Sequence, residues 1–197
     1  MPDSYCLTGP ERLLCFRVLT VCTGNVYRSP LVERLLRDRL AAEQTTIHVS
    51  SAGTAAVPGA PVADAPSVAG WVADTPRLVT RRLTAGLVDN SDLVLGAATE
   101  HREAAVRLSP VRALSRAFSL REFARLVRAE DGAGVADPAA RFAALVRGAA
   151  ARRGTAAAEG ADDDVTDPLG ASPAEVRLCV ARIEESVERI ATAMRAG

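Results

Sequence analysis

The strongest constraint on this chain is a ten-residue stretch, residues 21–30, that reads VCTGNVYRSP. The run before it, residues 16–21, is short, apolar and rich in β-branched residues, which is typical of a buried parallel strand. After it, Ser29 can cap a helix that starts at Pro30, where proline's missing N–H has no intrahelical partner. A strand that enters a helix through a glycine-containing turn directs backbone N–H groups at one point, where the helix dipole favours an anion. The stretch therefore predicts a loop that holds a phosphate.

Cys22 lies at the start of this turn and Arg28 lies at its end. An arginine is permanently charged and can bind two phosphoryl oxygens at once. The same positive surroundings favour the nucleophilic thiolate form of a cysteine. The pair predicts a nucleophile beside its oxyanion clamp, although a bare Cys-x5-Arg spacing fits a packed, inert cysteine equally well.

The wider motif decides between these interpretations. Cys22-Thr23-Gly24-Asn25 followed by Arg28-Ser29-Pro30 resembles the signature of the low-molecular-weight protein tyrosine phosphatases and the related arsenate reductases. Ser51-Ala52-Gly53, after a second strand predicted at 46–50, resembles the same family. The resemblance implies that Ser29 hydrogen-bonds the Cys22 sulfur and that Asn25 and Ser51 support the loop. It also implies a phosphate-binding set made of Thr23, Gly24, Asn25, Val26, Tyr27 and Arg28.

A second catalytic group follows from the same resemblance. Asp167-Pro168 precedes the last predicted helix, at the position of the family's general-acid loop. Proline restricts the preceding aspartate to an extended backbone, which helps to aim its carboxylate. The expected reaction is hydrolysis of a phosphomonoester, with protein phosphotyrosine as the expected substrate, through a phosphocysteine on Cys22, with Asp167 as the acid. It requires no cofactor and no metal.

Strand and helix patterns alternate along the rest of the chain. Strands are predicted at 91–95 and 117–120, and helices at 30–43, 83–89, 99–108 and 121–128, with a further helix near 65–72 that contains Trp71. This alternation predicts an α/β fold with a parallel sheet covered on both faces. The resemblance implies three layers with a four-stranded sheet of order 2-1-3-4. In that order the end of the first strand lies at the topological switch point, where such sheets bind ligands.

We expect one domain at 13–197, preceded by an extension at 1–12. Compared with typical family members, an Ala/Gly/Arg-rich insertion spans about 129–164, with a helix at 139–153 and a flexible stretch after Gly154. A capping box at Ser172-Pro173-Ala174-Glu175 opens the closing helix. Its apolar residues recur four and three apart, as in a core-facing stripe, so a monomer or a weak homodimer is expected.

Composition excludes several classes of partner. The formal net charge is zero and all 24 basic residues are arginine, so nothing indicates nucleic acid or a membrane surface. No stretch approaches the roughly 18 apolar residues of a membrane span, and four irregularly spaced cysteines fit a reducing, cytoplasmic setting. Asp162–Asp164 is interpreted as a solvated acidic run rather than as metal ligands. His48 and His101 are expected on a strand and on a helix surface, with no assigned role.

The chain departs from the family pattern at the rim of the expected site. Tyr27 occupies the place of a second cysteine, so no protective disulfide with Cys22 is expected, and Tyr27 either forms a new pocket wall or packs beneath the loop. Leu169 stands where a tyrosine is common. These changes leave open the alternative that the protein is a phosphate-binding regulator that has lost turnover. An arsenate reductase is disfavoured because no cysteine lies between the third strand and Asp167, and an arginine phosphatase because Val26 replaces a threonine.

Overall fold

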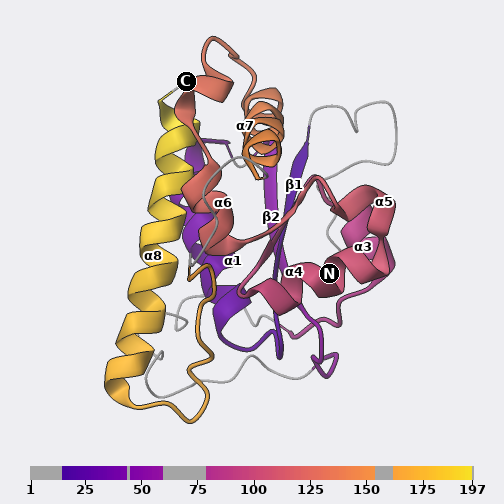
Figure 1. Ribbon diagram of the computed structural model, residues 1–197, viewed down its shortest axis with the longest axis vertical. Helices are drawn as coiled ribbons and strands as arrows, with labels where there is room; N and C mark the ends of the chain where they lie inside the picture. The colour runs from indigo at the N-terminus through magenta and orange to yellow at the C-terminus, as the bar shows by residue number, and fades with distance from the viewer. Residues whose placement is uncertain (1–14, 44, 60–78, 154–161, 197) are drawn as a thin grey trace.

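The computed structural model describes residues 15–43, 45–59, 79–153 and 162–196 (Figure 1). The expected N-terminal extension at 1–12, the predicted helix at 65–72 and most of the stretch after Gly154 lie outside the described residues.

The centre of the fold is a four-stranded parallel sheet. Its strands are β1 (Phe16–Cys22), β2 (Ile47–Gly53), β3 (Leu93–Gly96) and β4 (Ala117–Ser119), and their spatial order is β2-β1-β3-β4. The predicted order 2-1-3-4 is confirmed. β1 has a hydrogen-bonded neighbour on each side, and all of its side chains except Arg17 are buried. This burial explains why the strand is a continuous apolar run rather than an alternating one.

Helices cover both faces of the sheet and give three layers (Figure 1). Along β1, Phe16 and Val18 belong to one apolar cluster, and Leu19 and Val21 belong to the other, because successive side chains point to opposite faces. The first cluster is closed by α1 (Arg28–Arg39), α6 (Leu120–Leu126), α7 (Pro138–Arg152) and α8 (Pro173–Arg195). The second is closed by α3 (Ala85–Asp89), α4 (Thr99–Leu108) and α5 (Pro110–Ala113).

The closing helix α8 packs its apolar stripe into the first cluster. The stripe residues Ile183, Val187, Ile190 and Met194 are buried and Val180 is partly buried. Ser172 accepts a hydrogen bond from the Glu175 N–H, and the Glu175 carboxylate accepts one from the Ser172 N–H. The predicted capping box and the predicted core stripe are therefore both present.

The predicted insertion contributes to the core through α7. Phe142 of α7 is fully buried and stacks on Phe16 at the start of β1, with 4.6 Å between the ring centroids. At the end of the helix, Arg153 pairs with Glu122 of α6 and lies over the Phe118 ring of β4. A 3-10 turn, η3 (Ala129–Gly132), links α6 to α7 and is tied to Arg152 through Asp131. This segment thus supports the end of the sheet where the strands begin, away from the Cys22 end.

Several predicted boundaries are wrong by a few residues. The helix predicted at 30–43 is α1 from Arg28 to Arg39 followed by a 3-10 turn, η2 (Ala41–Glu43). The third strand begins at Leu93 rather than at Ser91, and the short helix α5 was not predicted. Within the residues that the structure describes, no helix combines the length and the apolar character that crossing a membrane requires.

Candidate active site

The predicted phosphate loop lies at the topological switch point of the sheet. β1 ends at Cys22, and α1 begins at Arg28, so the five residues 23–27 join the central strand to the helix. At this end Val21 pairs with Ala52 of β2 on one side and with Gly96 of β3 on the other. No side-chain cap closes the start of α1, so the N–H groups of its first turn remain available to an anion.

Asn25 holds the loop in an unusual backbone conformation. Its φ is +55°, and it is the one described non-glycine residue with a positive φ. Its amide donates to Ser29 Oγ at 3.0 Å and to Ser51 Oγ at 2.9 Å, and its carbonyl oxygen accepts from the Arg81 N–H at 2.8 Å. The structure therefore places Asn25 and Ser51 in direct contact, and three hydrogen bonds offset the cost of the left-handed backbone.

Gly53, at the end of β2, allows the loop to approach the sheet. A Cβ at this position would lie 2.6 Å from the Thr23 carbonyl oxygen and 2.7 Å from the Asn25 nitrogen. Both are backbone atoms of the loop, which cannot rotate away as a side chain could. The glycine in the Ser51-Ala52-Gly53 sequence is therefore a steric requirement of the loop, which the sequence pattern had not explained.

Ser29 does not cap α1 as predicted, because the helix starts before it and its hydroxyl turns inward. Ser29 Oγ lies 3.0 Å from Cys22 Sγ and 3.2 Å from the Ala52 carbonyl oxygen, to which it donates. A hydroxyl carries one proton, so it can donate either to Ala52 or to a Cys22 thiolate, but not to both. With the Asn25 amide donating to the same oxygen, Ser29 is arranged to stabilise a charged sulfur.

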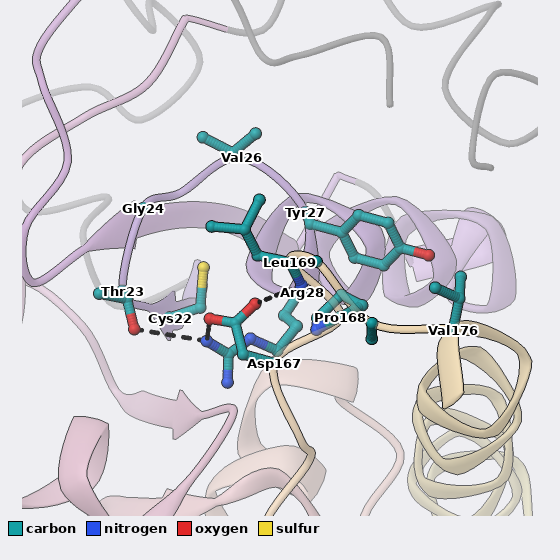
Figure 2. Close-up of a pocket in the computed structure, with 12 residues that line it drawn as sticks. Cys22, Thr23, Gly24, Val26, Tyr27, Arg28, Asp167, Pro168, Leu169 and Val176 are labelled. Atoms are coloured by element: carbon teal, nitrogen blue, oxygen red, sulfur yellow. Dashed lines mark hydrogen bonds and ion pairs between the residues drawn. The ribbon is translucent and has the colours of Figure 1, made fainter. Parts of the chain in front are cut away.

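Arg28 and Asp167 meet beside the Cys22 sulfur (Figure 2). The Arg28 side chain is 5% exposed and forms an ion pair with the Asp167 carboxylate, which is 49% exposed. Arg28 also donates to the Val165 carbonyl oxygen at 3.0 Å and to Thr23 Oγ1 at 3.3 Å. The other Asp167 oxygen accepts from the Leu169 N–H at 3.1 Å. The structure thus brings Asp167 into contact with Arg28, which lies 139 positions earlier in the sequence, at the cavity that Cys22 also lines.

His101 was predicted on a helix surface, and this prediction is wrong. The side chain is 1% exposed, at the start of α4, and its Nδ1 accepts from the Ala98 N–H at 3.1 Å. Neutral His101 must then carry its proton on Nε2, which lies 3.0 Å from Thr23 Oγ1. Burial lowers the pKa of His101, and the charge on Arg28 lowers it further. A neutral histidine therefore joins α4 to the phosphate loop.

A cavity of about 420 Å³ opens above the loop. Its base is formed by Cys22, Thr23, Gly24 and Arg28, and its walls are largely apolar. The wall residues come from the loop, the segment that follows Asp167 and the start of α8: Val26, Tyr27, Pro168, Leu169, Ala171 and Val176. Leu169 is 92% exposed, so it stands at the rim.

Tyr27 fits both of the alternatives that the sequence left open. Its ring lines the cavity on the side of Val176 (Figure 2) and also packs against the core cluster. Its hydroxyl is buried and has no hydrogen-bond partner among the described residues. Burial and the neighbouring Cys179 raise the pKa of Tyr27. The ring rather than the hydroxyl is therefore the part of Tyr27 that the fold uses.

The described cysteines form no disulfide with one another. These residues are Cys15, Cys22 and Cys179, and Cys15 lies at the opposite end of β1 from Cys22. Cys179 of α8 is buried, and desolvation raises its pKa to about 11. A thiol with so high a pKa is a poor nucleophile at neutral pH. Among the described residues, no cluster of histidine, cysteine and carboxylate side chains has the arrangement of a metal site.

Comparisons with known proteins identify the family of the chain. Residues 17–146 match the sequence model of the family described as low molecular weight phosphotyrosine protein phosphatase. The low molecular weight protein-tyrosine-phosphatase Etp of Escherichia coli K12 is 38% identical over 96 residues, which cover 47% of this chain and 62% of Etp. This chain therefore aligns with less than two thirds of that relative's length.

Solved structures share the fold. A YwlE mutant from Bacillus subtilis gives a TM-score of 0.64 at 22% identity, over 91% of this chain and 99% of that chain. The Erwinia amylovora tyrosine phosphatase amsI gives a TM-score of 0.63 at 19% identity, over 91% and 93%. Because the family match spans well over half of the sequence, the resemblance predicted from the Cys22 motif is confirmed, and the chain belongs to the low molecular weight phosphotyrosine protein phosphatase family.

Proposed function

We propose that this protein hydrolyses a phosphomonoester, with protein phosphotyrosine as its substrate, through a phosphocysteine intermediate on Cys22. The observation that supports this most directly is the convergence of Cys22, Arg28 and Asp167 on one cavity. Family membership supports the same reaction class.

In the first proposed step, the Cys22 thiolate attacks phosphorus and the bond to the leaving oxygen breaks. The Ser29 hydroxyl, 3.0 Å from the sulfur, stabilises the thiolate by turning its proton from Ala52 to Cys22. Asp167 donates a proton to the departing oxygen, because it is the one carboxylate among the described residues that line the cavity. The products are a phosphocysteine and an alcohol.

In the second proposed step, Asp167 removes a proton from the water that attacks the phosphocysteine, and inorganic phosphate leaves. The backbone N–H groups of residues 23–28 and the Arg28 guanidinium stabilise the charge on the equatorial oxygens in both steps. Arg28 pairs with Asp167. Phosphate binding must therefore draw Arg28 away from Asp167, which leaves the carboxylate to act on the leaving group.

The walls of the cavity support an aryl phosphate as substrate. Val26, Tyr27, Pro168 and Leu169 present apolar surface to whatever group the phosphate carries. A phenyl ring gains free energy against such walls. A phosphoarginine would bring a guanidinium group, and Asp167 is the sole acidic side chain in the described lining that could pair with it. Phosphotyrosine is therefore the better fit.

The test is hydrolysis of an aryl phosphate by single variants. Cys22→Ser should abolish turnover, and Asp167→Ala should lower kcat by roughly 10² to 10⁴. Cys15→Ser is the matched control, because it replaces a cysteine at the opposite end of β1 from Cys22, and it should retain wild-type turnover. Turnover that survives Cys22→Ser would overturn the proposal.

The same assay distinguishes the proposed enzyme from the alternative, a regulator that binds phosphate without turnover. Such a protein would release one equivalent of alcohol per Cys22 and then stop, whereas the proposed enzyme continues to release alcohol and phosphate. A parallel assay with phosphoarginine peptides checks the substrate class. We place the activity in the cytoplasm, because a catalytic thiolate needs a reducing compartment.

A further inference from the structure

The segment that contains Asp167 is held in place by polar contacts with several elements of the fold. This segment, residues 162–167, is called the acid strap here. Its first three residues, Asp162, Asp163 and Asp164, were predicted to be a solvated acidic run. Asp162 and Asp164 are exposed, as predicted, whereas Asp163 is half-buried, and each of the three carboxylates also has a partner on another element of the fold.

Asp163 binds the strap to α6. Its two carboxylate oxygens accept from Arg125, at 3.3 Å from Nε and 2.7 Å from the terminal nitrogen Nη2. The carboxylate is 20% exposed, so solvent screens this bidentate pair less than an ordinary surface pair. The Asp163 carbonyl oxygen also accepts from the Ser119 hydroxyl at 2.9 Å, at the end of β4. Both side-chain partners therefore come from the β4–α6 unit.

Asp164 binds the strap to α4. One of its oxygens accepts from the Thr99 N–H at 2.7 Å and from the Thr99 hydroxyl at 2.8 Å. Thr99 is the first residue of α4, and the preceding Ala98 has no side-chain oxygen to cap the helix. Asp164 therefore supplies from a distant segment the acceptor and the negative charge that a helix N-terminus favours.

Val165 links the anchored residues Asp163 and Asp164 to Asp167. The Val165 N–H donates to the Ala97 carbonyl oxygen at 2.8 Å, and the Val165 carbonyl oxygen accepts from Arg28. The Val165 side chain is buried. Two residues later, Asp167 meets Arg28. The acid strap is thus held at α6 and α4, and its end contacts Arg28. One residue, Thr166, separates Val165 from Asp167.

We propose that Asp163 and Asp164 are positioning residues that hold Asp167 where it can protonate the leaving group. This inference rests on the proposed function, because it requires Asp167 to be the general acid. Displacement of a catalytic group by about 1 Å can cost on the order of 10² in rate. Loss of either anchor allows the strap to move by such an amount, while Cys22 and the phosphate loop keep their own supports.

Asp162 provides a matched control in the same run. It pairs with Arg121 at 3.2 Å and with Arg182 at 2.9 Å, but its carboxylate is 58% exposed. Exposed ion pairs contribute little to stability. Its carbonyl oxygen, which accepts from Arg121, is retained in any substitution. Asp162→Ala should therefore leave the acid in place.

The experiment compares kcat/KM across aryl phosphates whose leaving phenols differ in acidity, from dinitrophenyl phosphate to phenyl phosphate. A poor leaving group needs the acid and a good one does not. Asp163→Ala and Asp164→Ala should each lower kcat/KM for phenyl phosphate by roughly 10-fold to 10²-fold. For dinitrophenyl phosphate the change should stay within about twofold. Asp164→Asn, which keeps an oxygen for Thr99, should restore most of the loss.

A purely structural role would lower the rates for all substrates by the same factor, because it acts on the fraction of folded protein. The ratio between the two substrates is independent of that fraction, so a partly unfolded variant still gives an answer. An unchanged ratio in both Asp163→Ala and Asp164→Ala, or the same changed ratio in Asp162→Ala, would overturn the inference. Asp167→Asn is measured alongside. If this variant also leaves the ratio unchanged, then the proposed acid itself is wrong.

Discussion

Three residues of this site each have a single proton or polar atom whose hydrogen-bond partner determines what the residue can do. Ser29 has one hydroxyl proton to share between Ala52 and Cys22, and His101 has one to offer Thr23. Tyr27 has a buried hydroxyl without a partner in the described parts of the chain. Each of these arrangements leads to a measurable difference between closely related side chains.

Tyr27→Phe should stabilise the protein or leave its stability unchanged. Burial of an unpaired hydroxyl costs about 1–3 kcal/mol, and phenylalanine removes that hydroxyl while keeping the ring. The free energy of unfolding from urea titration should therefore rise, by up to about 1 kcal/mol. Tyr27→Leu, which loses the ring, should lower it. A loss of more than about 1 kcal/mol in Tyr27→Phe would mean that the hydroxyl is hydrogen-bonded.

His101 should make stability fall in mild acid. Its pKa is lowered in the fold by burial and by Arg28, while Glu100, Asp167 and Asp164 oppose this shift. Below a pH of about 6.5 the unfolded chain binds a proton that the folded chain resists, so the free energy of unfolding drops as the pH falls. His101→Gln keeps an acceptor for the start of α4 and does not titrate.

The measurement is urea unfolding at pH 7.5 and at pH 5.5 for both proteins. The wild type should lose more stability between the two pH values than His101→Gln does. Carboxylates titrate in both proteins and cancel in the comparison. Equal losses in the two proteins would contradict a buried, neutral His101.

At the scale of elements, the site depends on how closely β2 and the phosphate loop pack. Gly53 is the contact point, since a side chain there would meet loop backbone at 2.6 Å and 2.7 Å. Gly53→Ala should lower kcat/KM for an aryl phosphate by at least about tenfold and should also destabilise the fold. Gly86→Ala is the control, because Gly86 is exposed in α3, where alanine favours the helix. Wild-type kinetics in Gly53→Ala would contradict the steric argument.

The sequence predicted the elements that have strong local signals. The run before Cys22, the helix at 99–108 and the capping box at Ser172 all appear where they were expected, because periodicity and capping are local properties. Contacts between distant segments carry no such signal. The pairing of Asp163 with Arg125 and that of His101 with Thr23 join residues 38 and 78 positions apart. The partners of the acid strap were therefore not predicted, and the buried His101 was wrongly predicted at a helix surface.

The start of α1 was misplaced for a related reason. Ser29-Pro30 has the local signature of a helix N-terminus, but the Ser29 hydroxyl bonds to Cys22, Asn25 and Ala52 instead. Tertiary contacts at a functional site override local propensity. Of the two roles predicted for Ser29, the structure shows the contact with the Cys22 sulfur and not the helix cap.

At the scale of the whole molecule, the site and the helix α7 occupy opposite ends of the sheet. Phe142 of α7 is fully buried against Phe16 and Phe123. Phe142→Ala should lower the free energy of unfolding by about 3–5 kcal/mol, through lost burial and a cavity. Phe142→Leu should cost less. In both variants kcat/KM per folded molecule should stay within about twofold of the wild type, and a large kinetic loss would show that α7 acts on the site.

The central claim is that Cys22 accepts the phosphoryl group. Asp167→Ala slows the proposed breakdown of the intermediate, so this variant is mixed with dinitrophenyl phosphate, quenched in acid within milliseconds and analysed by peptide mass spectrometry. The account predicts one added phosphoryl group on the peptide that contains Cys22, and none when Cys22→Ser is combined with Asp167→Ala. A phosphoryl group on a different residue, or turnover by Cys22→Ser with no phosphorylated protein at any time, would contradict the account.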